Sequence, residues 1–334
     1  MVYVYRGDTV ESVHRGSAVI CDSDGKIILN IGNPDFITFM RSTAKPFQVI
    51  PLIESGASRK FGFTSKEIAL MAGSHSGESM HEDSVTGILD KLGLSDKDLK
   101  CGIHIPHYYK VKNLTPRPSD AFSPLQNNCS GKHAAMLALC KFKSWPTKNY
   151  LDYDHPCQKA ILKAVASACH YPEEKIGRGY DGCGAPVFAL PLRNMAWGMA
   201  QLLSPNTVPR EIAKVYSSIT LAMREHPEMV SGEGRFDYEL SNASNGKVIS
   251  KSGAEGTQAF GIPEKRYGGI VKIDDGATRA VWPATLEILH QAGYLEDESI
   301  SKLRNLVSPE IIDHNEKVIG KIRCRFQIKR SEEN

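Results

Sequence analysis

The sequence contains no uninterrupted apolar run of about 18 residues, the length that a membrane-spanning helix needs. It also has no dense run of Lys and Arg. Its 41 basic residues are balanced by 38 acidic ones, whereas a nucleic-acid-binding surface needs concentrated positive charge. Residues 1–7 lack the basic segment, apolar core and cleavage site of a signal peptide. We therefore expect a cytoplasmic protein that binds a small molecule, and neither a membrane nor a nucleic acid.

The cysteines form no Cys-x-x-Cys pair and follow no regular spacing. There are eight, at positions 21, 101, 129, 140, 157, 169, 183 and 324. A disulfide framework is therefore not expected in a cytosolic chain of this size. Most of these thiols are expected to be buried as small apolar side chains.

The order of periodic segments predicts a single α+β domain over residues 1–334, with strands from both ends of the chain flanking a helical middle. A content of 41% hydrophobic residues is ample for a large core. Residues 102–126, rich in Pro, His and Tyr, predict a long irregular excursion, and the polar end 328–334 is expected to be disordered. The patterns predict strands at 16–21, 26–31, 247–250, 259–261 and 266–273, and helices at 46–56, 65–73, 79–92, 132–142, 156–170, 192–203, 209–226 and 283–292.

The segment that points most directly to chemistry is Arg-Ser-Thr-Ala-Lys-Pro at residues 41–46. Ser42 and Lys45 are three residues apart, so they share one face of a helical turn, and the Lys45 amine can reach the Ser42 hydroxyl as its base. The amine must then be neutral, which requires an enclosed site containing further positive charge. Ser-x-x-Lys also occurs at Ser244 and Ser299, but in turn-forming or strongly charged surroundings. The alternative for Ser42 is a helix N-cap beside a surface lysine.

Two further segments supply partners for such a pair. Lys251 lies in Lys-Ser-Gly directly after the apolar Val248-Ile249, and Lys-[Ser/Thr]-Gly late in a chain that begins with Ser-x-x-Lys is the order found in penicillin-recognising enzymes. A surface lysine on a hairpin edge is the alternative. In Gly-Ser-His-Ser-Gly-Glu at residues 73–78, Ser74 is a candidate second hydroxyl that relays protons. The sequence does not decide whether Ser74 or Ser76 faces the site.

Cys129 and Cys183 are flanked by small, polar turn residues, an unusual setting for thiols that only fill a core. Two thiolates and one more donor would form an open zinc site with room for water or substrate.

Together, the blocks at residues 41–46, 73–78, 128–133, 180–186 and 251–256 resemble the asparaginase II family, the rhizobial-type or class 3 L-asparaginases. The blocks recur in the family's order across nearly the whole chain. The resemblance implies a fold like that of serine β-lactamases and penicillin-binding proteins, with an antiparallel sheet and flanking helices. It also implies a homodimer.

For the site, the resemblance implies Ser42 as nucleophile with Lys45, and a second tandem of Ser74 with Lys251. It implies one zinc ion per subunit, which orients the substrate and is held by Cys129, Lys132 and Cys183. Other residues in or beside the matched blocks are candidates for supporting roles: Asp181 as acceptor for Lys132, and Arg41 and His133 for substrate contacts.

The expected activity is therefore hydrolysis of L-asparagine to L-aspartate and ammonia through an acyl-enzyme on Ser42. Two alternatives remain among enzymes: a glutaminase, whose substrate is longer by one methylene, and another hydrolase of the β-lactamase type. An alternative from a different class is a zinc-stabilised binding protein without catalysis.

Overall fold

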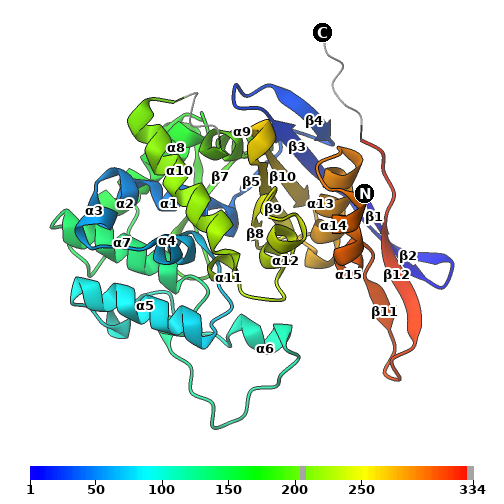
Figure 1. Cartoon of the computed structure of the whole chain (residues 1–334), viewed down its shortest axis with the longest axis horizontal. Coiled ribbons are helices and arrows are strands. Elements are labelled where there is room, and N and C mark those ends of the chain that lie inside the picture. Colours follow the sequence, from blue (N-terminus) through cyan, green and yellow to red (C-terminus); the bar gives the residue numbers. More distant parts are fainter. Residues whose placement is uncertain (204–207, 329–334) are drawn as a thin grey trace.

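A computed structural model describes residues 1–203 and 208–328 of the chain, and its centre is a five-stranded antiparallel sheet in the order β4-β3-β10-β9-β8 (Figure 1). The first strands of this sheet come from the start of the chain and the others from its last third. Val19 lies opposite Ile270 where these two parts pair. The expectation that one sheet joins distant parts of the chain is confirmed. The strands are β3 (Gly16–Cys21), β4 (Ile27–Ile31), β8 (Ile249–Gly253), β9 (Thr257–Ile262) and β10 (Tyr267–Ile273).

Both faces of the central sheet are covered. Successive residues of a strand point to opposite faces, so Val19 and Ile270 contribute to the core on the side of α9 (Leu192–Leu203). Their neighbours Ile20 and Val271 contribute to a second core, on the side of α13 (Thr278–Gln291). Coverage on both faces explains why β3 and β10 read as continuous apolar runs. The predicted α+β class, with an antiparallel sheet and flanking helices, is confirmed.

Two smaller antiparallel sheets complete the strand content, and neither was recognised in the sequence. One has the order β11-β12-β1-β2, so that the start of the chain pairs with residues near its end; the other has the order β5-β7-β6. Several of their strands are largely exposed, which weakens the apolar pattern, and the buried β7 begins and ends with proline. The strands are β1 (Val2–Arg6), β2 (Thr9–His14), β5 (Ile37–Phe39), β6 (Gly177–Tyr180), β7 (Pro186–Pro191), β11 (Glu310–Ile312) and β12 (Val318–Cys324).

The helices follow the predicted pattern with three notable differences. The helix expected over 46–56 is divided into α1 and α2 and preceded by a 3₁₀ turn, η1 (Arg41–Ala44). The helix expected to begin at Pro283 begins at Thr278 and holds that proline in its interior. The 102–126 excursion is interrupted by the short α6. Besides α9 and α13, the described α-helices are α1 (Lys45–Gln48), α2 (Ile50–Glu54), α3 (Ala57–Lys60), α4 (Ser65–Ala72), α5 (Ser79–Leu92), α6 (His107–Val111), α7 (Ser130–Phe142), α8 (Pro156–Ala168), α10 (Arg210–Glu225), α11 (Pro227–Val230), α12 (Phe236–Ala243), α14 (Asp297–Lys302) and α15 (Arg304–Val307).

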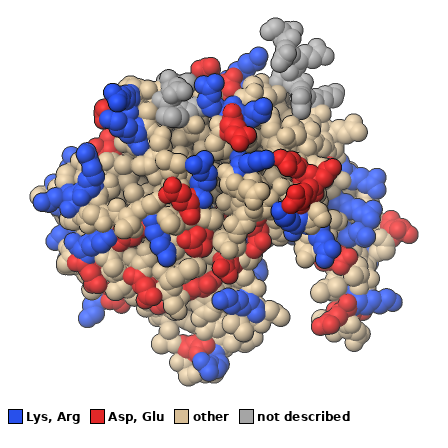
Figure 2. Space-filling view, in the orientation of Figure 1, with Lys and Arg blue, Asp and Glu red and all other residues tan. Residues whose placement is uncertain are grey.

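The surface in the view of Figure 2 mixes Lys and Arg with Asp and Glu, without a broad area of one sign. None of the described helices combines the length and apolar character that crossing a membrane demands. At the end of the chain, the Ile328 N–H donates a hydrogen bond to the Gln291 side chain (3.0 Å). The rest of the tail expected to be disordered, residues 329–334, lies outside the described residues.

Close packing of β10 on α9 predicts that Gly268→Ala is strongly destabilising. A β-carbon at Gly268 would collide with the backbone of Ala196 and Ala200, and backbone cannot move aside as a side-chain end can. We expect the free energy of unfolding to fall by roughly 2–4 kcal/mol, measured by denaturant titration. Gly87→Ala is the matched control, since Gly87 lies in α5 with open space around it, and this change should stabilise slightly. Equal stabilities of the two variants would contradict the packing described.

Candidate active site

Ser42 and Lys45 lie on two successive short turns, η1 and α1. The second packs against α8 and α4, and the first packs beside β8 and β7. The turn approaches β8 closely at Gly253, where a β-carbon would lie 3.1 Å from the Thr43 side chain and 3.2 Å from the Met40 carbonyl. Glycine at this position therefore lets the Ser42 turn lie against the strand that carries Lys251. Two of the sequence blocks, 200 residues apart, meet here.

Arg41, directly before Ser42, has a left-handed backbone with φ of 52°. A non-glycine residue in this region is uncommon and costs on the order of 1 kcal/mol, and such strain concentrates at functional sites. Its side chain is held from outside the turn, because Nε and Nη2 both donate to Asp181 Oδ1 (3.1 and 2.8 Å). Substrate contact by Arg41 stays a prediction, and in this structure Asp181 engages its guanidinium.

The Lys45 amine is enclosed as the sequence required, with 1% of the residue exposed. Burial lowers its pKa from the ordinary 10.5, which favours the neutral amine. The amine donates to the Asn128 carbonyl (2.8 Å), and it forms no hydrogen bond with the Ser42 hydroxyl. Hydrogen bonds between catalytic groups are often long without substrate and tighten in the complex. The Ser42–Lys45 pair therefore stays a prediction, although its amine is buried beside the expected nucleophile turn.

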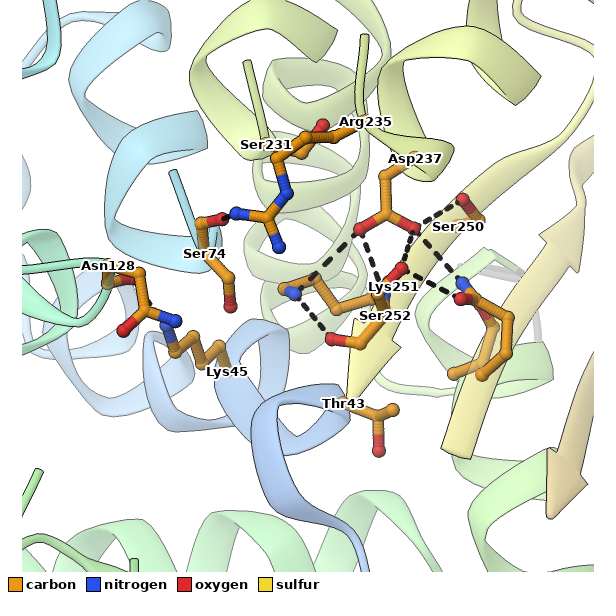
Figure 3. A network of polar contacts seen from close by, with 12 residues as sticks. Thr43, Lys45, Ser74, Asn128, Ser231, Arg235, Asp237, Ser250, Lys251 and Ser252 are labelled. Carbon is orange, nitrogen blue, oxygen red and sulfur yellow. Dashed lines mark hydrogen bonds and ion pairs between the residues drawn. The ribbon is translucent and has the colours of Figure 1, made fainter. Parts of the chain in front are cut away.

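The choice between Ser74 and Ser76 is informed by their hydroxyl partners. Ser76 Oγ donates to Glu78 (3.0 Å), which leaves it occupied. Ser74 Oγ is buried, with 3% of the residue exposed, and has no hydrogen-bond partner. In Figure 3 it points into the space between the Lys45 and Lys251 side chains. A buried hydroxyl without a partner is costly, so this arrangement favours Ser74 as the group that a substrate would satisfy.

Lys251 is completely buried, and Asp237 from α12 lies 3.9 Å from its amine. Burial lowers the pKa of Lys251 to about 7, against a smaller opposing effect of Asp237. The amine donates to the Ser252 carbonyl (2.7 Å). Asp237 itself accepts hydrogen bonds from the Ser250 hydroxyl (2.8 Å) and the Ser252 N–H (2.9 Å), as Figure 3 shows. It also accepts one from the Gln258 amide (3.0 Å). Lys251 is thus a fixed, buried amine rather than a surface group.

The two expected metal thiols lie together with Lys132. Its amine donates to Cys183 Sγ (3.2 Å), and all three side chains are buried. A hydrogen bond from Cys129 lowers the pKa of Cys183 to about 4, and the same bond raises the pKa of Cys129 to about 12. Burial opposes the charge on Lys132, yet the nearby sulfur atoms raise its pKa overall. One thiolate, one thiol and one ammonium therefore share this position when no metal is bound.

The donor set fits zinc, since two sulfurs and one amine nitrogen already converge in a buried place and a metal can displace their protons. Among the described residues, no three His, Cys, Asp or Glu side chains gather into a metal-binding group. A metal ion here therefore needs Lys132 as its third donor. Asp181 lies near enough to Lys132 for each to favour the charge of the other, but its hydrogen-bond donors are Arg41 and the Gly182 N–H, so its role as acceptor for Lys132 stays a prediction.

His133 is fully buried, and its Nδ1 is 2.7 Å from the Tyr150 hydroxyl. Burial lowers its pKa to about 3, so the ring is neutral. Its Nε2 has no partner. Contact between His133 and substrate stays a prediction.

Several polar residues of this region were missed by sequence reasoning. Asp237 and Arg235 precede or begin α12, outside every recognised block. Asp237 is buried and Arg235 is partly buried, and the burial of single charged residues is not visible in a sequence pattern. Gln258 lies on β9 in the middle of an apolar run, which was a detectable signal. Asn128 and Ser252 lie within recognised blocks, but their roles as acceptors for Lys45 and Lys251 depend on backbone carbonyls.

The arrangement combines a half-buried serine on a strained turn, two buried amines with lowered pKa values, and a buried hydroxyl without a partner. Such groups can remove a proton from a nucleophile and deliver one to a leaving group near neutral pH. This chemistry suits acyl transfer.

Comparison with known proteins gives a match of residues 2–324 to the family model described as L-asparaginase II. No curated protein matches the chain. Among solved structures, it is similar to the crystal structure of a β-lactamase from Mycobacterium bovis, with a TM-score of 0.45 and 12% sequence identity over 84% of this chain and 95% of that one.

The buried position of Lys251 predicts a specific pH dependence of stability. Between its folded pKa of about 7 and the ordinary value of 10.5, the unfolded chain holds a proton that the folded chain lacks, so stability rises with pH. We expect wild-type stability, relative to Lys251→Met, to increase by on the order of 1 kcal/mol per pH unit from pH 7 to pH 10. Urea titrations at each pH measure this difference. Parallel pH curves for the two proteins would show that the amine is not buried.

Proposed function

The chain belongs to the L-asparaginase II family, and we propose that it hydrolyses L-asparagine to L-aspartate and ammonia through an acyl-enzyme on Ser42. The observation that carries this proposal is the enclosure of two amines, Lys45 and Lys251, around the unpartnered hydroxyl of Ser74, beside the strained turn of Ser42. A surface role for either lysine does not account for their burial.

In the first step, the neutral Lys45 amine accepts the proton of the Ser42 hydroxyl while Oγ attacks the side-chain carboxamide carbon of asparagine. Burial lowers the pKa of Lys45 and so provides the neutral base. The tetrahedral oxyanion is stabilised by nearby backbone N–H groups, the usual device for this charge.

In the second step, the carbon–nitrogen bond breaks as Ser74 passes a proton from Lys251 to the departing nitrogen, which leaves as ammonia. A pKa of about 7 lets Lys251 give and regain a proton near neutrality. Water then adds to the β-aspartyl ester and gives a proton through Ser74 back to Lys251, and Lys45 returns its proton to the Ser42 oxygen as the ester bond breaks and aspartate is released. Asp237 holds Lys251 throughout from the side opposite the hydroxyl.

We further propose that Cys129, Lys132 and Cys183 hold one zinc ion, with Asp181 supporting Lys132. When bound, zinc supplies a positive charge that orients the substrate, since Ser42 already provides the nucleophile. Asp181 also accepts both hydrogen bonds from Arg41. The metal-site loop and the nucleophile turn are therefore connected by one carboxylate. The homodimer, the single-domain organisation and the cytoplasmic location stay predictions.

Ammonia release from asparagine, glutamine and a chromogenic lactam, measured side by side with lactam opening, tests the function. We expect asparagine to be the preferred substrate and Ser42→Ala to lower turnover by at least about 10⁴-fold with an unchanged fold, because the nucleophile is lost. Ser299→Ala is the matched control from another Ser-x-x-Lys and should keep full activity.

Three outcomes would point elsewhere. Preference for glutamine or for the lactam would favour one of the rival hydrolases. Zinc binding without release of ammonia from any amide would favour the binding protein. A folded Ser42→Ala protein with full activity would remove the proposed mechanism.

Zinc binding is testable without any activity measurement. We expect one zinc per chain in the wild type, with a raised melting temperature and release of protons, because Cys129 and Lys132 must deprotonate. Cys129→Ser and Cys183→Ser should lose the ion. Cys21→Ser, which changes a buried thiol near Arg193 instead, should keep it. Elemental analysis after exhaustive dialysis against trace zinc measures the stoichiometry, and equal zinc content in all four proteins would contradict the assignment.

A further inference from the structure

Arg235 is a site residue that neither the sequence blocks nor the proposed reaction uses. It lies between α11 and α12, and its Nη1 donates to the Ser74 carbonyl (2.8 Å) and to the His75 carbonyl (3.5 Å). Figure 3 shows its other terminal nitrogen pointing toward the space between Ser74 and Lys251. Its guanidinium therefore borders the proposed reaction centre directly.

The charge of this guanidinium has no close partner. Within residues 1–203 and 208–328, no carboxylate forms an ion pair with it, although Asp237 is only two residues away. Asp237 is engaged by Lys251, Ser250, Ser252 and Gln258. Arg41, by contrast, is paired with Asp181. Arg235 is partly buried, an arginine stays charged in such a place, and a charge withdrawn from water without an ion-pair partner favours a ligand that supplies one.

The surroundings of Arg235 favour an anion. The amines of Lys45 and Lys251 lie near enough to influence each other's charge, and Arg235 acts on Lys251 in the same way. His75 and His107, which lie near Lys45 and Arg235, are kept neutral by burial. Apart from the occupied Asp237, the titratable side chains around the Ser74 hydroxyl are therefore basic, and the Asn128 and Ser252 carbonyls already accept hydrogen bonds from the two amines. A ligand carboxylate would complement them, and arginine is the side chain best suited to bind one.

We propose that Arg235 binds the carboxylate of the substrate, which restricts the site to small amides that carry a free carboxylate. This inference rests on the proposed function, because L-asparagine carries a carboxylate that is separated from its amide carbon by two carbon atoms. Binding that carboxylate orients the amide toward Ser42 and leaves the Ser74 hydroxyl available to the departing nitrogen. The same contact sets specificity, since a neutral amide leaves the guanidinium unpaired.

Three amides test this assignment in the zinc-loaded protein: L-asparagine, succinamate, which keeps the carboxylate but lacks the amine, and β-alaninamide, which keeps the amine but lacks the carboxylate. For the wild type we expect kcat/KM for β-alaninamide to be lower than for asparagine by at least about 100-fold. Arg235→Gln should lower kcat/KM for asparagine and succinamate by about 100-fold, chiefly through KM. It should leave β-alaninamide within about twofold of the wild type.

Two variants serve as controls. Arg235→Lys keeps a cation and should lose less affinity for the carboxylates than Arg235→Gln. Arg178→Gln removes an exposed arginine that lies over Tyr153 and should change nothing. Circular dichroism and thermal unfolding establish that each protein is folded. If β-alaninamide loses as much as asparagine in Arg235→Gln, the residue only supports Ser74 and the assignment is wrong.

A binding measurement separates this inference from the proposed function. Calorimetric titration with succinate and with β-alaninamide, in Ser42→Ala and in Ser42→Ala/Arg235→Gln, needs no turnover. Succinate binding that weakens about 100-fold with the second change supports the inference, even if none of the amides is hydrolysed and the proposed function fails. Succinate binding that is absent, or equal in both proteins, overturns it.

Discussion

The site depends on the burial of basic side chains away from water. Lys45 and Lys251 are almost fully enclosed, and Arg235 borders the same space (Figure 3). Removing such groups from water disfavours their charged forms, which makes an amine into a base at neutral pH. A serine without a histidine partner needs this effect. The fold provides it by placing η1, β8 and the Ser74 segment around one small region (Figure 3), beside the helical core in which α1 packs against α4 and α8.

Two carboxylates hold the basic side chains of this region in place. Asp237 holds Lys251 and the end of β8. Asp181 holds the strained Arg41 turn and lies beside the thiols and Lys132. Neither forms an ion pair with Arg235, although Asp237 is near enough to favour the charge of the guanidinium. The charges of Lys251 and Arg41 are thus balanced by carboxylates where the site must be rigid, whereas the charge of Arg235 has no ion-pair partner where a substrate would bind. This is the expected condition for selective binding of an anion.

The sequence alone was enough to predict the five strands of the central sheet, most helices and the residues of the recognised blocks. These signals are local: apolar periodicity, turn residues and caps, such as the Thr64 cap of α4 with its Glu67 partner. The small sheets were missed because β1 pairs with β12 across the whole chain and both strands are only partly buried. Asp237 and Arg235 could not be predicted for a related reason. Their roles arise from the packing of α12 against β8, which no local pattern encodes.

The central claim is that Lys45 makes Ser42 the nucleophile, and covalent labelling tests it most directly. A diazoketone analogue of asparagine, with a diazomethyl group in place of the amide nitrogen, reacts with an activated nucleophile bound near its carbonyl carbon. Peptide mass analysis should find the label on Ser42 in the wild-type protein and none in Lys45→Met, whose side chain has similar bulk but no base. Labelling of Ser74 or a cysteine instead of Ser42, or equal labelling of Ser42 in Lys45→Met, would contradict the account.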